Sequence, residues 1–138
     1  MTVRRLGGYA ARSMDRGQAQ DALLVLTTCD SAARARALAE HLVDRHLAAC
    51  VNTLDAVQSS YRWQGRIEHA AELLLLVKTT RERYDAVEAA IREHSSYELP
   101  EVIAVPIARG FDRYIDWIRA ATAAEGNSDS APSNDESP

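Results

Sequence analysis

Two acidic residues lie close together in the string Tyr97-Glu98-Leu99-Pro100-Glu101, and paired carboxylates can act as a general acid and a general base. Pro100 keeps Leu99 out of the helical region, so this string forms a fixed turn. An enzyme would also need a nucleophile and a base within reach of one another, and the sequence identifies neither beside Glu98 and Glu101. We therefore interpret both as solvated or ion-paired carboxylates and expect a protein that is not an enzyme.

The two cysteines, Cys29 and Cys50, are far apart in the sequence and do not form a CxxC motif. This spacing indicates neither a disulfide framework nor a structural zinc site. Cys50 precedes Val51 in an apolar segment, so we expect it in the core. A reducing compartment suits such cysteines, and we expect a cytoplasmic protein.

Lys78 is the only lysine among 16 basic residues. A genomic preference for arginine explains this, but so does a need for a compact ammonium group after the apolar run 73–77, where arginine would be too large. The net charge of −4 comes from the four acidic residues after position 124, so the body of the chain is neutral. A neutral body argues against a nucleic-acid partner, and the lack of an apolar run of roughly 20 residues argues against a membrane partner.

One long hairpin dominates the elements that must position these residues. Residues 48–62 and 66–77 have the pattern of extended segments joined by Trp63-Gln64-Gly65, a connection of hairpin length. Residues 73–77, LLLLV, are apolar on both faces, so this strand needs cover from both sides. A chain of 138 residues has room for one domain with a modest core, which offers little such cover.

A buried strand at residues 21–29 and an amphipathic helix precede the hairpin. Asp30 or Ser31 can cap this helix of about fifteen residues. Its apolar face comprises Ala35, Leu38, Ala39, Leu42 and Val43. The helix and the strand together would form half of a core around the hairpin.

A second helix follows the hairpin, and Thr79 and Glu82 have the spacing of a capping box at its start. Its apolar face comprises Tyr84, Val87, Ile91 and His94. Residues 101–107 predict a fourth strand, in which Pro106 belongs at an edge. After Gly110, a last helix has an apolar face made of Phe111, Tyr114, Ile115, Trp117 and Ile118.

The order strand, helix, strand, strand, helix, strand, helix predicts an α+β protein with a ferredoxin-like (split βαβ) antiparallel sheet, a long β-hairpin and an extra C-terminal helix. Both main helices then cover one face of the sheet and leave the other bare. Because the strands are apolar on both sides, we expect the bare faces of several copies to pack together. Residues 21–124 would form this domain, between a flexible N-terminal extension at 1–20 and a disordered acidic tail at 125–138.

Several strings of the sequence together resemble the CutA family of divalent-cation tolerance proteins. They are LAACVN (47–52), SSYRWQGRIE (59–68), LLLLVKTT (73–80) and YELPEVIAVPIARGFDRYIDWI (97–118). Separate strings in the right order are a more specific signal than any one short motif. The resemblance implies a ferredoxin-like homotrimer whose hairpin reaches neighbouring subunits, with no required cofactor and a role in tolerance of copper and similar divalent ions.

The resemblance also implies a metal site. The family's proposed ligands are a cysteine at the end of the first strand and a histidine before the Tyr-Glu-x-Pro-Glu string, which correspond to Cys29 and His94. Thiolate and imidazole suit a copper or zinc ion. Ser95 stands where relatives typically carry histidine, and a third ligand would come from Asp30, Glu98 or another subunit. Alternatively, Cys29 is a small buried thiol and His94 a helix-terminal residue near backbone carbonyls.

A second function is suggested by the likeness of the family's trimers to the PII signalling proteins, which bind small molecules between subunits. A PII-like cleft between subunits would be lined by Trp63, Lys78, Tyr97 and Glu98. It would hold a small anionic or nucleotide-like ligand through Lys78 and amides at strand ends. Alternatively, Trp63 and Tyr61 anchor an interface of a scaffolding trimer. The remaining histidines are expected to be exposed: His41, His46 and His69.

Overall fold

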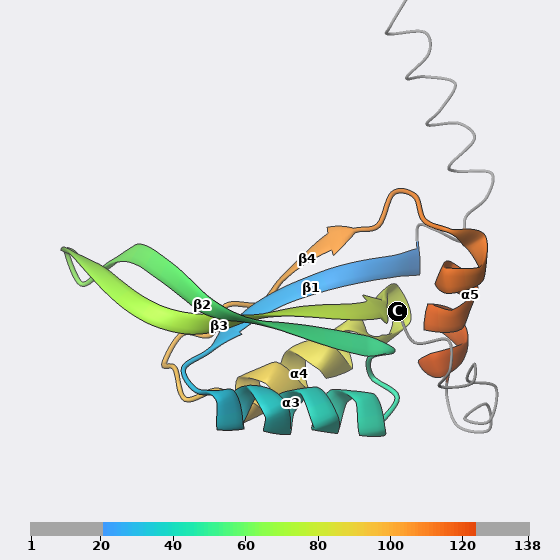
Figure 1. Cartoon of the computed structure of the whole chain (residues 1–138), viewed down its shortest axis with the longest axis horizontal. Coiled ribbons are helices and arrows are strands. Elements are labelled where there is room, and N and C mark those ends of the chain that lie inside the picture. Colours follow the sequence, from blue (N-terminus) through green and yellow to red (C-terminus); the bar gives the residue numbers. More distant parts are fainter. Residues whose placement is uncertain (1–20, 124–138) are drawn as a thin grey trace, which may run out of the picture.

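The computed structural model describes residues 21–123, which form a four-stranded antiparallel sheet and three α-helices (Figure 1). The order of strands and helices is the one that the sequence predicts, with a short 3-10 helix (η1) added. The elements are β1 (Ala22–Cys29), α3 (Ala32–Asp44), β2 (Cys50–Trp63), β3 (Arg66–Thr80), η1 (Arg81–Arg83), α4 (Tyr84–His94), β4 (Ile103–Pro106) and α5 (Asp112–Ala121). The predicted N-terminal extension and acidic tail lie outside the described residues.

The strands lie in the order β2-β3-β1-β4, and β3 has a different environment at each end. Residues 73–80 of β3 pair with β1, and residues 74–78 of this stretch also pair with β2, whereas residues 66–72 pair with β2 alone. We call this two-stranded part, residues 57–72, the outer hairpin; it projects beyond the rest of the sheet in Figure 1. At the opposite edge, β4 pairs with β1 and ends at Pro106, which confirms the predicted edge position.

The hairpin turns and bends at residues with positive φ. Gln64 (φ 50°) and Gly65 (φ 80°) connect the paired residues Trp63 and Arg66, and positive φ at both positions is typical of the type I′ turn that suits hairpins. Ala56 (φ 61°) lies in a register shift between Leu54 and Val57, which is a β-bulge. Such bulges bend a strand and increase its twist, so the outer hairpin starts at a bend.

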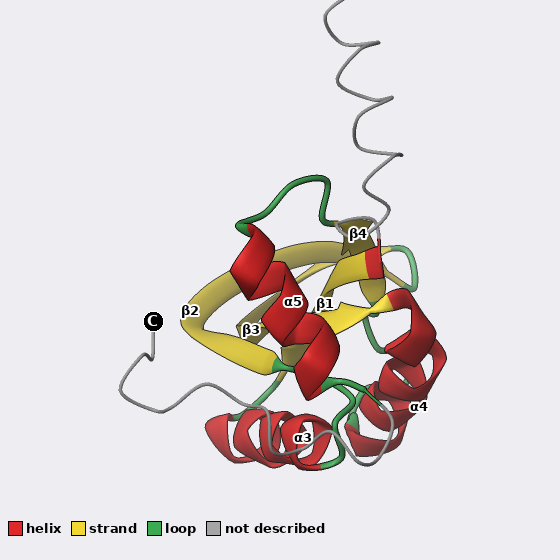
Figure 2. Cartoon of the chain, turned by 90° about the vertical axis from the view of Figure 1, so that its right-hand side faces the viewer, coloured by secondary structure: helices red, strands yellow, loops and turns green. Residues whose placement is uncertain are grey.

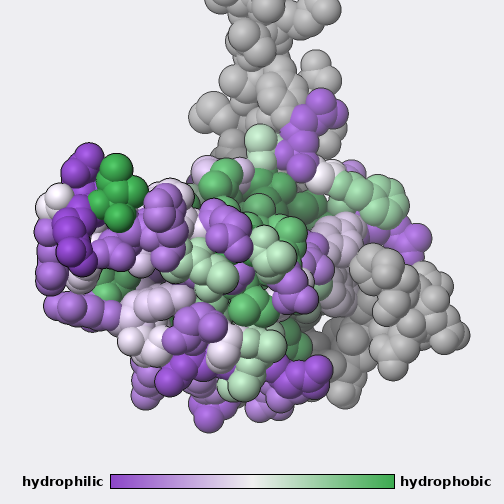
Figure 3. Space-filling view, turned by 60° about the vertical axis from the view of Figure 1, so that its left-hand side comes forward, coloured by the Kyte–Doolittle hydropathy of each residue, from purple (hydrophilic) through white to green (hydrophobic). Residues whose placement is uncertain are grey.

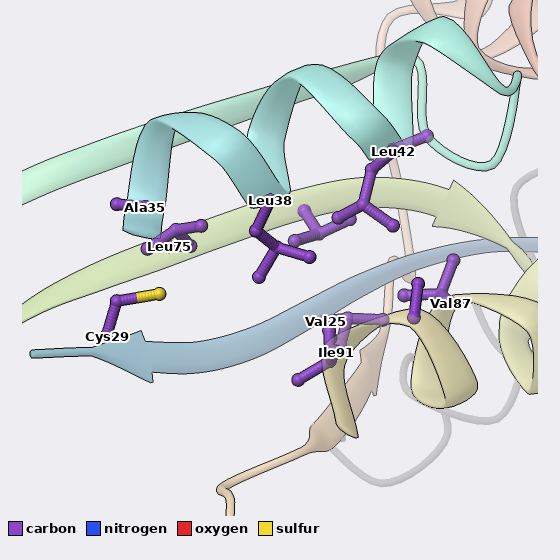
Figure 4. Close-up of a cluster of buried hydrophobic side chains, with 11 residues drawn as sticks. Val25, Cys29, Ala35, Leu38, Leu42, Leu75, Val87 and Ile91 are labelled. Carbon is purple, nitrogen blue, oxygen red and sulfur yellow. The ribbon is translucent and has the colours of Figure 1, made fainter. Parts of the chain in front are cut away.

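Helices α3 and α4 cover one face of the sheet (Figure 2). The core beneath them contains the side chains in Figure 4, among them Leu75 and Val77, each 0% exposed. Of the two predicted capping residues, Ser31 caps α3, because its hydroxyl accepts a hydrogen bond from the Arg34 amide at 3.2 Å. The predicted apolar face is buried at Leu38 and Leu42, but Val43 at its margin is exposed.

The predicted capping box at Thr79 and Glu82 is wrong. Thr79 is a buried residue of β3, and its hydroxyl donates to the Leu47 carbonyl at 2.6 Å. Thr80 is the cap of η1 instead, and its side chain makes no capping hydrogen bond. The physical reason is that the strand continues to Thr80, so that the Thr79 hydroxyl is buried and must be satisfied within the core.

Helix α5 closes the end of the sheet where β1 begins and β3 ends (Figures 1 and 2). Ile115 and Ile118 of α5 pack with Ala22 and Ala49 in a second, smaller apolar cluster. Phe111 was expected on this apolar face, but it precedes the helix and is 70% exposed. None of the helices within residues 21–123 has the length and apolarity needed to cross a membrane.

Within residues 21–123, no helix covers the centre of the other face of the sheet, which we call the open face. Alternate residues of neighbouring strands put large apolar side chains there: Leu24, Leu26, Leu54, Leu74, Leu76, Ile103 and Val105. Ile103 is 53% exposed, and hydrophobic side chains gather in the middle of the surface in Figure 3. Cys50, opposite Lys78, is half-buried, which corrects its predicted place in the core.

Candidate functional site

A cleft of about 640 Å³ lies between the outer hairpin and the loop that leads from α4 to β4. The hairpin contributes Ser59, Ser60, Tyr61, Trp63 and Glu72, and β1 and the loop contribute Thr28, Ser96, Tyr97, Glu98, Leu99 and Glu101. These side chains are hydroxyl-bearing, aromatic or acidic for the most part. None of the described residues that line the cleft is basic, so its charge is negative.

Glu72 is an acidic group of the cleft that accepts hydrogen bonds from several side chains. It is half-buried in β3, where it lies opposite Val57. The Tyr97 hydroxyl donates a hydrogen bond of 2.6 Å to Glu72 Oε2. The hydroxyls of Ser59 and Thr28 also donate to this carboxylate, so groups from three segments converge on it.

These contacts keep Glu72 ionised. Partial burial alone would raise the pKa of Glu72, but hydrogen bonds from Ser59, Tyr97 and Thr28 together hold it below the ordinary value. The pKa of Tyr97 is raised, first by burial and then by the hydrogen bond to Glu72, so its phenol remains a donor. The pair therefore presents a fixed negative charge at neutral pH.

The loop on the far side of the cleft is held in place by Asp30. Ser96 Oγ donates to Asp30 Oδ2 at 2.8 Å, and the Arg34 guanidinium lies 3.5 Å from Asp30 Oδ1. Within the loop, the Tyr97 amide donates to Ser95 Oγ at 3.0 Å. These bonds fix the backbone on each side of Ser96, which positions Tyr97 over Glu72.

The structure brings together part of the predicted cleft. Trp63, Tyr97 and Glu98 line it, and Glu101 joins them. Glu72 was missed, because a single acidic residue before an apolar run looks like an ordinary solvated residue. One feature of the sequence could have revealed it. Glu72 lies in the same strand as the apolar run 73–77, which needs cover on both faces, so a partly covered carboxylate at this position also needs hydrogen-bond partners.

Lys78 lies elsewhere in the chain. It is near the far end of β3, about 20 Å along the strand from Glu72 at roughly 3.3 Å per residue. Its ammonium nitrogen lies 5.7 Å from the centre of the Tyr114 ring, in cation–π contact with α5. Within one chain, therefore, Lys78 does not contribute to the cleft.

Cys29 and His94, the two predicted metal ligands, have different neighbours. Cys29 is 8% exposed and lies with Ala35 and Leu75 in the helix-covered core (Figure 4). Burial, and then the charge of Asp30, raises the pKa of the Cys29 thiol, which disfavours the thiolate that a metal requires. His94 Nδ1 lies 3.0 Å from the Ala90 carbonyl, and its ring contacts the ring of His41.

The histidines expected to be exposed differ among themselves. His69 is exposed and bonds the Ser60 hydroxyl at 2.8 Å, as expected of a surface residue. His41 and His46 are half-buried instead, which corrects the prediction. His46 lies 3.2 Å from the Ala121 carbonyl at the end of α5. His41 and His46 are partly covered because His41 contacts His94 and His46 contacts the end of α5, and helical periodicity does not reveal such contacts between elements.

The donor set of the cleft suits a cation. Carboxylate and hydroxyl oxygens are ligands for hard divalent ions, and aromatic rings with carboxylates suit an organic cation. Within residues 21–123, however, no three His, Cys, Asp or Glu side chains are grouped closely enough to hold a metal ion. A metal bound here would therefore need water or a second chain to complete its coordination.

A helix-covered antiparallel sheet with a long hairpin and an acidic cleft defines the chain as a small α+β protein. Residues 23–121 match the family model for the CutA1 divalent ion tolerance protein. The chain therefore belongs to the CutA1 divalent ion tolerance family.

Named relatives agree with this assignment. The divalent-cation tolerance protein CutA of Thermus thermophilus is 43% identical over 72% of this chain and 96% of its own. Mouse protein CutA is 36% identical over 75% of this chain and 59% of its own, so the chain spans about three fifths of that relative. The chloroplastic protein CutA of Arabidopsis thaliana is 33% identical over 72% of this chain and 55% of its own.

Solved structures give the same result. The Thermus thermophilus protein superposes with a TM-score of 0.73 at 42% identity, over 74% of this chain and 99% of its own. CutA from Xylella fastidiosa has a TM-score of 0.73 at 37% identity, over 75% of this chain and 99% of its own. The α+β fold with its four-stranded sheet is thus that of the CutA1 structures.

Proposed function

We propose that the chain is a non-enzymatic, trimeric protein of ferredoxin-like fold that serves divalent-cation tolerance by binding the ion in the acidic cleft. The observation that carries the proposal is the carboxylate of Glu72, which three hydroxyl donors keep ionised beside Glu98 and Glu101. The family membership supports a role in metal tolerance. A cleft with fixed negative charge and oxygen donors supplies the chemistry for that role.

The trimer is supported by two surfaces that a single chain leaves uncovered. The open face carries large apolar side chains, and patches of this kind mark association sites. Among the described strands, none other pairs with the outer hairpin, and a two-stranded ribbon is marginally stable alone. Ile67 on it is 64% exposed. Neighbouring copies that cover the open face and contact the outer hairpin would bury the apolar surface and stabilise the two-stranded ribbon.

Assembly would also complete the ion's coordination. Ions such as Mn²⁺ and Mg²⁺ prefer oxygen ligands and can be held by one or two carboxylates with water molecules. The cleft's carboxylates meet this requirement, and a neighbouring copy could bring further ligands to the base of its outer hairpin. Copper or zinc at Cys29 and His94, with Asp30 or Glu98, remains a separate prediction because the two side chains lie among different neighbours.

Native mass spectrometry tests the proposal. We expect a trimer that takes up Mn²⁺, with uptake weakened at least about tenfold by Glu72→Gln and unchanged by the control Glu82→Gln, an exposed acid outside the cleft. A Cys29→Ser, His94→Gln variant titrated with Cu²⁺ and Zn²⁺ tests the alternative pair. If the Glu72→Gln variant takes up Mn²⁺ as well as the parent does, the cleft is not the site of the ion.

The second candidate is a PII-like regulatory trimer that binds a small molecule between subunits. The size of the cleft, about 640 Å³, and its aromatic residues Tyr61 and Trp63 favour this reading. Its acidic lining favours a cationic ligand over the anionic or nucleotide-like one that the sequence indicates. A thermal-shift screen separates the two, because a ligand at 100 times its Kd stabilises the native state by about 2.7 kcal/mol.

A cytoplasmic location forms part of the proposal. It rests on the two cysteines within residues 21–123, which are both free thiols. Free thiols are typical of a reducing compartment. Fractionation of the source cells, with the chain detected by antibody, tests this part independently of metal binding.

A further inference from the structure

His41 of α3 and His94 at the end of α4 form a histidine pair on the helix layer, and neither of them lines the cleft. Their ring centres are 4.7 Å apart, and the ring planes are inclined by 46°. Both residues are half-buried, and both line hollows at the surface of the protein. The pair joins residues 53 positions apart in the sequence, so only the packing of α3 against α4 creates it.

The hydrogen bond of His94 settles which of its nitrogens is available. Nδ1 lies 3.0 Å from the Ala90 carbonyl oxygen, which can only accept a hydrogen bond. Neutral His94 therefore carries its proton on Nδ1 and leaves the Nε2 lone pair without a proton. Metal-binding histidines commonly have this arrangement, with the other nitrogen bonded to a carbonyl that fixes the tautomer and the ring orientation.

The separation of the rings suits a shared ion. With metal–nitrogen bonds of about 2.0–2.1 Å, two imidazoles in neighbouring coordination positions place their ring centres about 4.5 to 5.2 Å apart. The observed 4.7 Å lies within this range. Neighbouring positions at right angles occur in square-planar and octahedral complexes, which Cu²⁺ and Ni²⁺ favour.

The charges beside the pair also favour a cation. Glu93 lines one hollow next to His41 and His94, and Glu40 and Asp44 line the other. Arg45 is the one basic residue lining either hollow within residues 21–123. Outside the hollows, Arg36 is paired with Glu40 at 4.0 Å, and Arg34, which donates to the His94 carbonyl at 3.4 Å, is paired with Asp30 at 3.5 Å. The carboxylates of the hollows together with Asp30 still outnumber these guanidinium groups and that of Arg45, so the surroundings are negative and attract a divalent ion.

We propose that His41 and His94 form a second cation site, which binds a transition-metal ion such as Cu²⁺, Ni²⁺ or Zn²⁺ through two imidazoles and completes its coordination with water. The inference rests on the proposed role in divalent-cation tolerance for its purpose, but its geometry depends neither on the cleft nor on assembly. It gives His94 a partner different from Cys29. It also divides the ions by chemistry, with imidazole-preferring metals here and oxygen-preferring metals in the cleft.

Calorimetric titration with Ni²⁺ at slightly alkaline pH, where histidine side chains are generally neutral, tests the site. We expect one Ni²⁺ per chain, and at least about a tenfold loss of affinity in His41→Gln and in His94→Gln, because each removes one of two ligands. His69→Gln is the matched control, since His69 is exposed and bonds only the Ser60 hydroxyl among the hydrogen bonds resolved for it.

Electron paramagnetic resonance of the unmodified protein with one equivalent of Cu²⁺ is a second test, and it does not depend on whether a variant folds. Coupling to two imidazole nitrogens is the expected spectrum, and coupling to one or none would overturn the proposal. Ni²⁺ affinity in His41→Gln equal to that of the parent would overturn it too. Failure of the cleft proposal would look different from failure of the histidine site, because it would appear as Mn²⁺ uptake that Glu72→Gln does not change.

Discussion

The two faces of the sheet are built from the same strands but have different surroundings. Leu75 and Val77 of β3 point toward α3 and α4 and are fully buried, whereas Leu74 and Leu76, which alternate with them, point to the open face and are only half-buried. The helix-covered face completes its core within one chain. The open face does not, so the comparison separates the residues that fold the chain from those available to assemble it.

The largest expected effect comes from a charge on the open face. Leu76 pairs with Leu26 and Asn52 in the centre of the sheet. In a trimer, Leu76→Glu would bury an unpaired carboxylate at the interface, which costs several kcal/mol, so the variant should be monomeric at micromolar concentration. Light scattering measures the mass, with the volume-conserving Leu76→Met as a control that remains trimeric. An unchanged mass in Leu76→Glu would show that the open face is not the interface.

A smaller effect is expected from a cavity on the covered face. Leu75→Ala should lower the free energy of unfolding by about 2–5 kcal/mol, because Leu75 is fully buried in the core. Urea denaturation measures this loss, and the matched substitution Leu74→Ala sharpens the comparison between the faces. Because unfolding of a trimer depends on protein concentration in every variant, sedimentation on dilution separates the two faces. The Leu74→Ala trimer should dissociate at a higher protein concentration than the Leu75→Ala trimer, and equal dissociation of the two would contradict the distinction.

A third prediction concerns the hydrogen bond between Tyr97 and Glu72 in the cleft. Tyr97→Phe removes the hydroxyl that donates to Glu72, so the protein should lose about 1–2 kcal/mol of stability and the pKa of Glu72 should rise. Urea denaturation measures the first and NMR titration of the Glu72 side chain the second. Tyr61→Phe, at an exposed tyrosine that also lines the cleft, should change neither.

The smallest expected effect is in the pH dependence of stability. Because the folded-state pKa of Glu72 is held below its ordinary value of about 4.3, its contribution is fully present above that value and is lost as the pH falls through the folded-state pKa. Glu72→Gln should therefore lose less stability than the parent between about pH 5 and pH 3. Urea midpoints across this range measure it, and identical slopes for the two proteins would contradict the assignment.

Much of the fold follows from periodicity. The long hairpin, the turn at Gln64 and Gly65 and the apolar open face are local patterns, and the structure contains each of them. The Thr79 capping box failed because the same spacing also occurs in a strand that runs on for one more residue. A local pattern therefore identifies an element more reliably than the exact residue at which it ends.

The site was harder to predict because its contacts join distant residues. Tyr97 and Glu72 are 25 positions apart, and their hydrogen bond exists only once the loop is tied to Asp30. Trp63, Tyr97 and Glu98 were grouped in the sequence by their mixture of aromatic and acidic side chains, and the structure places these three on one cleft. The place of Lys78 and the partner of His94 depend on strand length and helix packing, which spacing in the sequence does not determine.

The mass of the unmodified chain in solution tests the central claim that copies of this chain cover its open face. Sedimentation equilibrium at micromolar concentration should give three times the chain mass of 15.2 kDa, without dissociation on tenfold dilution. A single species of 15.2 kDa would contradict the account, because the apolar open face and the outer hairpin would then be stable without a neighbour.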